Sequence, residues 1–185
     1  MPFRAEASNR RTRARWRREA VATRWTDALA EELRRAPAFD GCALRRATRD
    51  DETFLFELHR SALRAYVDAT WGWDEDWQRA HFAAHYAPAR NALIVREATG
   101  GLAIGRISLS RQWQKIFLRD IELIAAERNR GLGTAVVNAV LALARESHRP
   151  VELLVLNCNP ARRLYERLGF SVIADDGSRL RMRAR

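Results

Sequence analysis

The sequence contains little cysteine and no long apolar run, and each shortage excludes a class of protein. Its two cysteines, Cys42 and Cys158, lie far apart and form no CxxC pair, which excludes a disulfide-rich scaffold and a thiolate zinc site. No apolar run approaches the roughly 20 residues that a membrane-spanning helix needs, so no membrane partner is expected. The basic start of the chain lacks the apolar stretch and the small-residue cleavage site of a secretory signal. We therefore expect a protein of the reducing, cytoplasmic compartment.

Lysine is almost absent, although the chain is strongly basic. Lysine and arginine together number 33 against 23 acidic residues, the formal net charge is +10, and Lys115 is the only lysine. Arginine matches the geometry of phosphate better than lysine does, so one interpretation is a polyanionic ligand such as nucleic acid or a phosphorylated cofactor. The other is a compositional bias that has placed arginine at surface positions throughout the chain. The charge alone does not decide between them.

The length of 185 residues and the hydrophobic content of 47% predict one globular domain with an appendage. Residues 1–18 carry seven arginines and a single acid, and an amphipathic helical pattern follows until Pro37. We expect this helix to pack on the domain or on a partner. We therefore divide the chain into residues 1–40, a basic N-terminal arm and helix, and residues 41–185, the main domain.

The pattern becomes regular from Cys42 onward. Apolar periodicity predicts a strand, two helices, three strands with short connections, a long helix, a strand, a short helix and a final hairpin. The first of these helices can be capped by Thr48 or Asp50. The three consecutive strands, rich in branched residues, indicate an antiparallel meander. The second helix follows WGWDED, and the three strands are NALIVREA, LAIGRISLS and IFLRDIELI. The long helix is opened by ERNRGLGTAV, the next strand is VELLVL, the short helix is PARRLYERLG, and the hairpin runs from FSVIA to RLRMR.

The stretch ERNRGLGTAV places Gly131 and Gly133 where a strand gives way to a helix, although glycine is a poor helix former. The first N–H groups of a helix have no partner within the helix and bind anions. Glycine leaves these amides accessible, and Arg128 and Arg130 add charge-assisted donors. The stretch therefore predicts a site for a pyrophosphate or a similar group.

Two common phosphate motifs do not fit this stretch. A Walker loop needs Lys-Ser/Thr after its second glycine, and a dinucleotide fingerprint needs a third glycine where Val136 stands. The remaining pattern, Arg-x-x-Gly-x-Gly at residues 128–133, resembles the acetyl-CoA pyrophosphate loop of the GNAT superfamily of acyl-CoA N-acyltransferases. The stretch NPARRLYERLGF, residues 159–170, is similar to the second signature of that family. The resemblance covers residues 42–185.

The resemblance implies a fold of the α/β (α+β) class. Its mixed, mostly antiparallel central sheet has helices on both faces, and its fourth and fifth strands are parallel and splay apart. Acetyl-CoA would bind as cosubstrate between IFLRDIELI and VELLVL, with pantetheine along the backbone of the fourth strand and without a metal. The residues implied for acetyl-CoA are Leu123, Ile124, Arg128, Asn129, Arg130, Gly131, Leu132, Gly133, Thr134, Asn159, Ala161 and Tyr165, with Asn157 as the alternative to Asn159.

The resemblance also implies direct attack of an amine on the thioester, so no covalent enzyme intermediate is required. Tyr165 matches the family tyrosine that protonates the departing thiolate, although it can also be a core residue. A base must remove a proton from the amine, and Glu122 or Asp120 on the predicted fourth strand could serve. The alternative for Glu122 is an acid on the solvated side of the strand.

Three other residues are weaker candidates. His81 and His85 have the i, i+4 spacing of a helical metal pair, but no third ligand is evident, so we expect no metal site. Cys158 is expected near the thioester, where a small cysteine at a strand end is more often structural than catalytic.

The acceptor side is predicted from AYVDATWGWDEDWQ, at the junction of the first two helices. Aromatic faces with nearby carboxylates suit a cationic amine, and the predicted binding residues are Tyr66, Trp71, Trp73, Asp74 and Glu75. In the alternative interpretation the tryptophans are core anchors and the acids favour a helix N-terminus. An acidic acceptor would instead direct attention to Arg60, Arg64 and Arg79 on the same two helices.

Together these features predict an acetyl-CoA-dependent N-acetyltransferase acting on an amine acceptor, a cationic small molecule or a peptide amine. The alternative is a non-catalytic module that senses acyl-CoA or binds nucleic acid through its basic arm. We do not expect nucleic acid as a partner, and a homodimer is compatible with the sequence.

Overall fold

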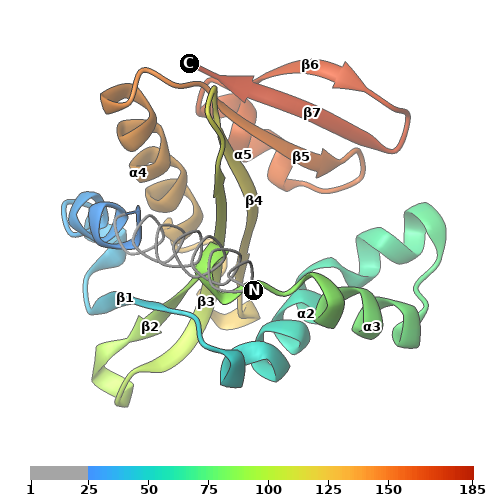
Figure 1. The fold of residues 1–185 in the computed structure, drawn as a ribbon, viewed down its shortest axis with the longest axis horizontal. Helices are drawn as coiled ribbons and strands as arrows, with labels where there is room; N and C mark the ends of the chain where they lie inside the picture. Colours follow the sequence, from blue (N-terminus) through green and yellow to red (C-terminus); the bar gives the residue numbers. More distant parts are fainter. Residues whose placement is uncertain (1–24) are drawn as a thin grey trace, which may run out of the picture.

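The computed structural model describes residues 25–185 (Figure 1). Their strands form one seven-stranded sheet in the order β1-β2-β3-β4-β5-β7-β6, in which β4 and β5 are the parallel pair and the other neighbours are antiparallel. The strands are β1 (Cys42–Arg46), β2 (Asn91–Arg96), β3 (Leu102–Arg111), β4 (Ile116–Leu123), β5 (Val151–Leu156), β6 (Ser171–Asp175) and β7 (Arg179–Ala184).

Helices cover both faces of this sheet. One apolar cluster joins the sheet to α2 and α3, and a larger one joins the opposite face to α4, α5 and the helical segment 25–33. The predicted fold class and element order are confirmed. The helices are α2 (Glu52–Trp71), α3 (Glu75–His85), α4 (Leu132–Glu146) and α5 (Ala161–Arg167), and the short 3₁₀ turns are η1 (Pro37–Phe39), η2 (Arg49–Asp51), η3 (Pro88–Arg90), η4 (Glu97–Thr99) and η5 (Ala125–Glu127).

The helical segment 25–33 belongs to the core. Trp25, Leu29 and Leu33 are buried in the cluster that contains α4, so the described part of this helix takes the first of its two expected positions, on the domain. The predicted arm lies within residues 1–24, outside the described residues. The division at residue 40 therefore stays a prediction, and the core itself continues across it.

Of the two predicted caps, Thr48 is the N-cap of the η2 turn that leads into α2, and Asp51 completes its capping box. The Asp51 carboxylate accepts hydrogen bonds from the Thr48 backbone at 2.7 Å and from Arg45 at 2.6 and 2.8 Å. The hydrogen bonds from Arg45 and Thr48 lower the pKa of Asp51 to about 2. The turn that leads into α2 is therefore stabilised by a negatively charged Asp51.

We expect Asp51→Asn to lower the free energy of unfolding by about 1 kcal/mol at neutral pH, a value reduced for solvent screening at the half-exposed Arg45. The folded-state pKa lies below the unfolded value, so this stabilisation is present above about pH 4 and is lost as the pH falls towards 2. Urea unfolding at several pH values measures the difference. Asp50→Asn is the matched control, and an equal loss in both variants would contradict the role of Asp51.

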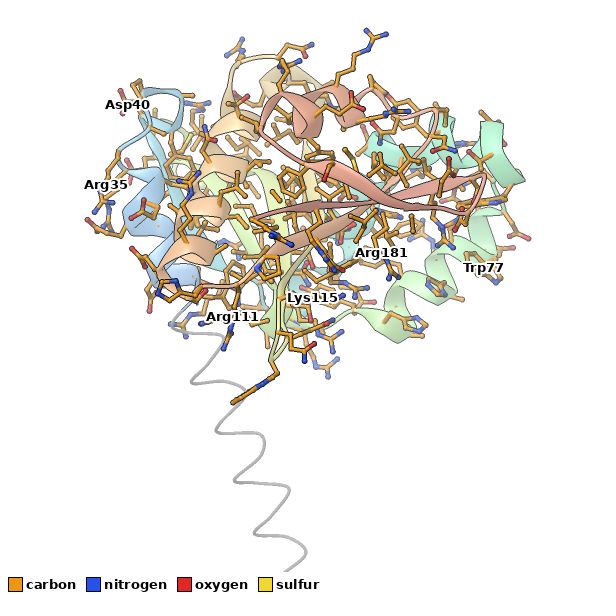
Figure 2. All side chains as sticks on the ribbon, turned by 90° about the horizontal axis from the view of Figure 1, so that it is seen from above. Arg35, Asp40, Trp77, Arg111, Lys115 and Arg181 are labelled. Carbon is orange, nitrogen blue, oxygen red and sulfur yellow. The ribbon has the colours of Figure 1, made fainter. Side chains whose placement is uncertain are left out.

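The basic side chains are spread over the molecule. Figure 2 labels Arg35 beyond the helical segment 25–33, Arg111 at the end of β3 and Arg181 on β7, which are separate elements. This distribution favours the interpretation of the arginine content as a general surface property.

The helices among residues 25–185 include none with the length and apolar character required to cross a membrane.

Candidate active site

β4 and β5 pair over only three positions before they diverge. Residues Ile116 to Leu118 pair with Val151 to Leu153, whereas β4 continues to Leu123 (Figure 1). Beyond these positions, the backbone N–H and C=O groups along the facing edges of β4 and β5 form no hydrogen bonds between the two strands. The splayed pair expected from the resemblance is therefore present, and its open edge can bind an extended ligand.

The predicted phosphate loop lies at the start of α4. Asn129 and Gly131 have positive φ angles of 61° and 85°, and the first helical hydrogen bond runs from Ala135 N–H to the Gly131 carbonyl. The N–H groups of residues 132–134 consequently precede the hydrogen-bonded part of the helix. A Cβ on Gly133 would contact the Leu164 side chain at 3.4 Å, so this glycine also lets α4 and α5 approach closely.

The two loop arginines have different surroundings. Arg128 Nε donates to the Leu123 carbonyl at 2.9 Å, and its Nη2 donates to the Ser61 carbonyl at 3.3 Å, so this side chain ties the loop to β4 and α2. Arg130 is 66% exposed and lies 3.9 Å from Glu127, which leaves its guanidinium available to an anion. Sequence reasoning treated both as phosphate donors and could not foresee the structural contacts of Arg128.

The backbone at the end of β4 is already partly used. Ile124 N–H donates to the Ile104 carbonyl and the Ile124 carbonyl accepts from Glu127 N–H, while Arg128 occupies the Leu123 carbonyl. A carbonyl oxygen has two lone pairs, so these groups can still accept from a pantetheine amide. The assignment of Leu123 and Ile124 to pantetheine stays a prediction.

The second signature forms the start of α5. The Asn159 side chain accepts from Ala161 N–H, the first amide of α5, at 2.9 Å, whereas Asn157 Nδ2 donates to the Gly177 carbonyl at 2.9 Å in the β6–β7 turn. Asn159 therefore lies at the β5–α5 junction and Asn157 braces the hairpin. The assignment of Asn159, with Asn157 as its alternative, to the cofactor stays a prediction.

Tyr165 on α5 is buried, with 9% of its surface exposed, and its ring packs 5.7 Å from that of Phe170. Burial, with a contribution from the nearby Asp120 charge, raises the pKa of Tyr165 to about 12. The phenol is therefore protonated at neutral pH and has a proton to donate. No hydrogen bond to its hydroxyl is found among residues 25–185.

Glu122 is buried beside an arginine. Its two oxygens lie 3.1 and 2.7 Å from the Arg106 guanidinium, which also lies 3.2 Å from Asp120. Burial alone would raise the pKa of Glu122, but Arg106 and a hydrogen bond from His59 outweigh it and lower that pKa. A carboxylate stabilised in this way is a weak proton acceptor, so Glu122 is better suited to orient a neighbour than to act as the base.

That neighbour is His59 on α2, which sequence reasoning missed. His59 Nδ1 lies 2.8 Å from Glu122 Oε1. We assign the Nδ1 proton to this bond, which leaves Nε2 unprotonated as the acceptor. His59 lies four residues after Leu55 and three after Phe56, both buried, and this spacing could have placed it on the inner face of α2.

A cavity of about 150 Å³ opens between α3 and the sheet. Its lining includes His59 from α2, Phe82 and Tyr86 at the end of α3, Arg106 from β3 and Asp120 from β4. Asp120 lines this cavity, and its negative charge also contributes to the raised pKa of Tyr165. β4 thus has links to both candidate proton-transfer groups, to His59 through Glu122 and to Tyr165 through the charge of Asp120.

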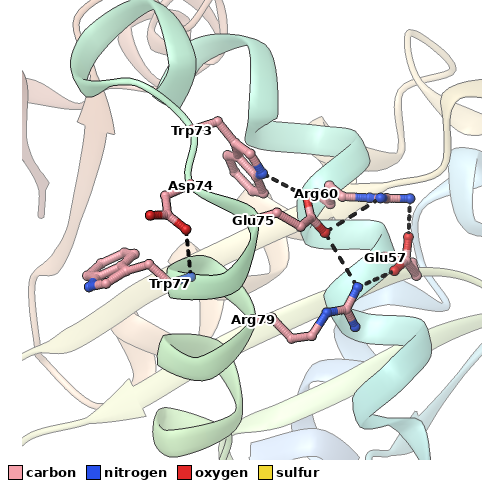
Figure 3. A network of polar contacts seen from close by, with 7 residues as sticks. All are labelled: Glu57, Arg60, Trp73, Asp74, Glu75, Trp77 and Arg79. Carbon is pink, nitrogen blue, oxygen red and sulfur yellow. Dashed lines mark hydrogen bonds and ion pairs between the residues drawn. The ribbon is translucent and has the colours of Figure 1, made fainter.

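The predicted acceptor residues Trp73 and Glu75 lie in a polar network (Figure 3). Trp73 Nε1 donates to Glu75 at 2.8 Å, and Glu75 lies within 3.6 Å of Arg60 and 3.4 Å of Arg79. The Trp73 hydrogen bond, with the charges of Arg60 and Arg79, lowers the pKa of Glu75. Its negative charge is already balanced by these arginines, so little of it remains for a cationic acceptor.

The other predicted acceptor residues do not line the cavity. The Asp74 side chain caps α3 by accepting from Trp77 N–H at 2.9 Å, which is the helix-terminus role foreseen as the alternative. Trp71 is 56% exposed, with the Arg179 guanidinium over its ring. The Tyr66 carbonyl accepts a weak hydrogen bond from Cys158, which places α2 beside the β5–α5 loop.

Within the described residues, one group of side chains has the donor set of a metal site: His59, Asp120 and Glu122. The Arg106 guanidinium already supplies positive charge to both carboxylates of this group. The rings of His81 and His85 on α3 lie 4.2 Å apart at an angle of 30°, and both residues lie outside the group.

Comparison with known proteins agrees with this architecture. The acetyltransferase (GNAT) family matches residues 54–170, well over half of the chain. The PaiA N-acetyltransferase of Thermoplasma acidophilum, solved in complex with coenzyme A, has 16% identity over 78% of this chain and 98% of its own, with a TM-score of 0.63. An acetyltransferase from Thermus thermophilus has 16% identity over 78% and 96%, with a TM-score of 0.59. At such identities these structures establish the fold, and no curated protein matches the sequence.

Proposed function

This chain belongs to the acetyltransferase (GNAT) family and is an acyltransferase, and we propose that it transfers the acetyl group of acetyl-CoA to an amine. The observation that carries the proposal is the presence of three features at β4: the splayed β4–β5 edge, the glycine loop that opens α4, and two groups able to transfer protons, His59 linked to β4 through Glu122 and Tyr165 through the charge of Asp120. The first two suit an extended ligand with a pyrophosphate, and the third supplies proton transfer on either side of the reacting bond.

Coenzyme A fits the donors that the loop offers. The N–H groups of residues 129–134 would hold the pyrophosphate, with Arg130 as an exposed charged donor. A side chain at Gly131 would demand a strained φ of +85° and would lie 3.1 Å from Ala38. The open edge of β4 near Leu123 and Ile124, with Asn159 and Ala161 opposite, would bind the pantetheine arm.

Acetyl-CoA supplies the acetyl group as a thioester. The acceptor nitrogen forms a C–N bond to the acetyl carbon while the C–S bond breaks. His59 Nε2 takes one proton from the nitrogen, and the Tyr165 hydroxyl gives one to the departing sulfur. Glu122 holds the imidazole in the required tautomer, as a positioning residue. This assignment replaces Glu122 as the proposed base, and Asp120 remains the alternative.

The test is thiol release. Purified protein, acetyl-CoA and a panel of amines are incubated, and free CoA is detected with a thiol reagent while mass spectrometry detects an acetylated amine. Amine-dependent CoA release supports the proposal. A rise in melting temperature with acetyl-CoA but no turnover on any amine would instead indicate an acyl-CoA-sensing module.

Tyr165→Phe is expected to lower kcat by about tenfold, below the usual range for a general acid because a thiolate leaves readily. The rise in melting temperature produced by CoA should persist, since only the hydroxyl is lost. Steady-state kinetics with thermal-shift measurements test both expectations. An unchanged kcat would mean that water or another group protonates the sulfur.

We also propose a cytoplasmic location, which the free thiols of Cys42 and Cys158 support. A homodimer and the absence of nucleic-acid binding stay proposals from the sequence.

A further inference from the structure

The cavity beside His59 is rich in positive charge. Among residues 25–185 it is lined by three arginines, Arg90, Arg106 and Arg119, by three histidines, and by a single carboxylate, Asp120. Arg106 is paired with Asp120 and with Glu122 beneath it. One cation and two carboxylates leave a charge of −1, and Arg90 and Arg119 bring the five groups to a net +1.

Arg90 and Arg119 have no ion pair or side-chain hydrogen bond within the described part of the chain. Both are exposed, and both line the cavity. Arginines without a carboxylate partner beside a small cavity form a site for an anion, because the guanidinium binds carboxylate and phosphate oxygens through paired donors.

A β-bulge explains why Arg119 faces the cavity. In the β3–β4 ladder Leu109 pairs with Leu118, but the next residue, Ser108, pairs with Asp120, which leaves Arg119 as the extra residue. The bulge interrupts the alternation of side chains, so the neighbours Arg119 and Asp120 both line the cavity. β4 thereby places the Arg119 guanidinium at the same cavity as Asp120, whose charge influences Tyr165.

The cavity also contains an unsatisfied acceptor. Asn91 is 6% exposed and lines the cavity; its Nδ2 donates to the Ala87 carbonyl, while its Oδ1 has no partner among residues 25–185. A buried acceptor without a partner is costly, so a donor from a ligand or from water is expected there. The cavity therefore suits a molecule with both an anion and an N–H donor.

We infer that the acceptor is a small amine that carries an anionic group, a carboxylate in the simplest case, which Arg90 and Arg119 bind while His59 faces the amine. This inference rests on the proposed acetyl transfer. It differs from the cationic acceptor predicted from Trp73 and Glu75, whose acid is balanced by Arg60 and Arg79. A volume of about 150 Å³ favours a compact acceptor such as an amino acid, since drug-sized ligands need roughly 300 Å³ or more.

The test compares amino acids with their carboxamides as acceptors, at saturating acetyl-CoA. The two members of each pair differ in the negative charge. The amine of the carboxamide is the less basic of the two and is more often neutral, so amine basicity cannot produce a preference for the carboxylate. We expect kcat/KM for the carboxylate member to be at least about tenfold higher, as a charge-assisted contact implies.

Arg119→Gln and Arg90→Gln should each reduce this preference, and the double variant should abolish it. Arg181→Gln, an exposed arginine on β7 outside the cavity, should leave the ratio unchanged (Figure 2). The rise in melting temperature with CoA should persist in the cavity variants, which distinguishes an acceptor site from a site for the phosphates of CoA.

Polyamines or neutral amines as preferred acceptors would overturn the inference and leave acetyl transfer standing. A carboxylate preference that survives the double variant would also overturn it. Absence of transfer to every amine, with CoA still binding, would refute the proposed function, and the acceptor assignment would fall with it.

Discussion

His59→Gln should lower kcat by about a hundredfold or more while the rise in melting temperature with acetyl-CoA stays the same. A positioned general base contributes typically about 10²–10⁴ in rate, and glutamine cannot accept a proton at neutral pH. Its side-chain amide can still donate a hydrogen bond to Glu122, so the buried Glu122–Arg106 pair keeps its partners. Single-turnover acetyl transfer measures the chemical step directly.

Asp120→Asn distinguishes the two candidate bases. If His59 is the base, the Asp120 variant should retain much more activity than the His59 variant, although it loses one ion pair to Arg106. Nearly full activity in His59→Gln together with loss in Asp120→Asn would transfer the role to Asp120. Glu122→Gln is a poor test, because it removes a charge partner of the buried Arg106 and is expected to destabilise the fold.

Gly131→Glu should abolish the stabilisation of the protein by CoA. A ligand at a hundred times its Kd stabilises the folded state by about 2.7 kcal/mol, which corresponds to a rise of about 5–10 °C for a protein of this size. Glutamate would place bulk and negative charge at the amides that open α4. Differential scanning fluorimetry with and without CoA gives the result.

Two controls separate binding from strain. The position has a φ of +85°, so Gly131→Glu will melt earlier even without ligand. Gly131→Ala carries the same backbone strain without the charge. Gly177→Glu, at φ +87° in the β6–β7 turn with open space around it, carries the same substitution away from the loop and should retain the response. A normal response in Gly131→Glu would refute the loop assignment.

The sequence by itself determined the features that depend on local chemistry. Glycines at a strand-to-helix junction, a cap at Thr48 and apolar periodicity act over a few residues, so they predicted the elements, their order and the position of the glycine loop that opens α4. The resemblance carried by residues 128–133 and 159–170 then implied the splayed strands, which the sheet confirms.

Only the tertiary structure decided which charges are balanced. Glu122 meets His59 across 63 positions of sequence, and Glu75 meets Arg60 across a helix junction, so neither contact can be deduced from spacing. Arg119 reaches the cavity because one residue is added to β4 opposite Ser108. Coulomb interactions act through space, between groups that the fold brings together, and a one-residue bulge reverses the face on which a side chain lies.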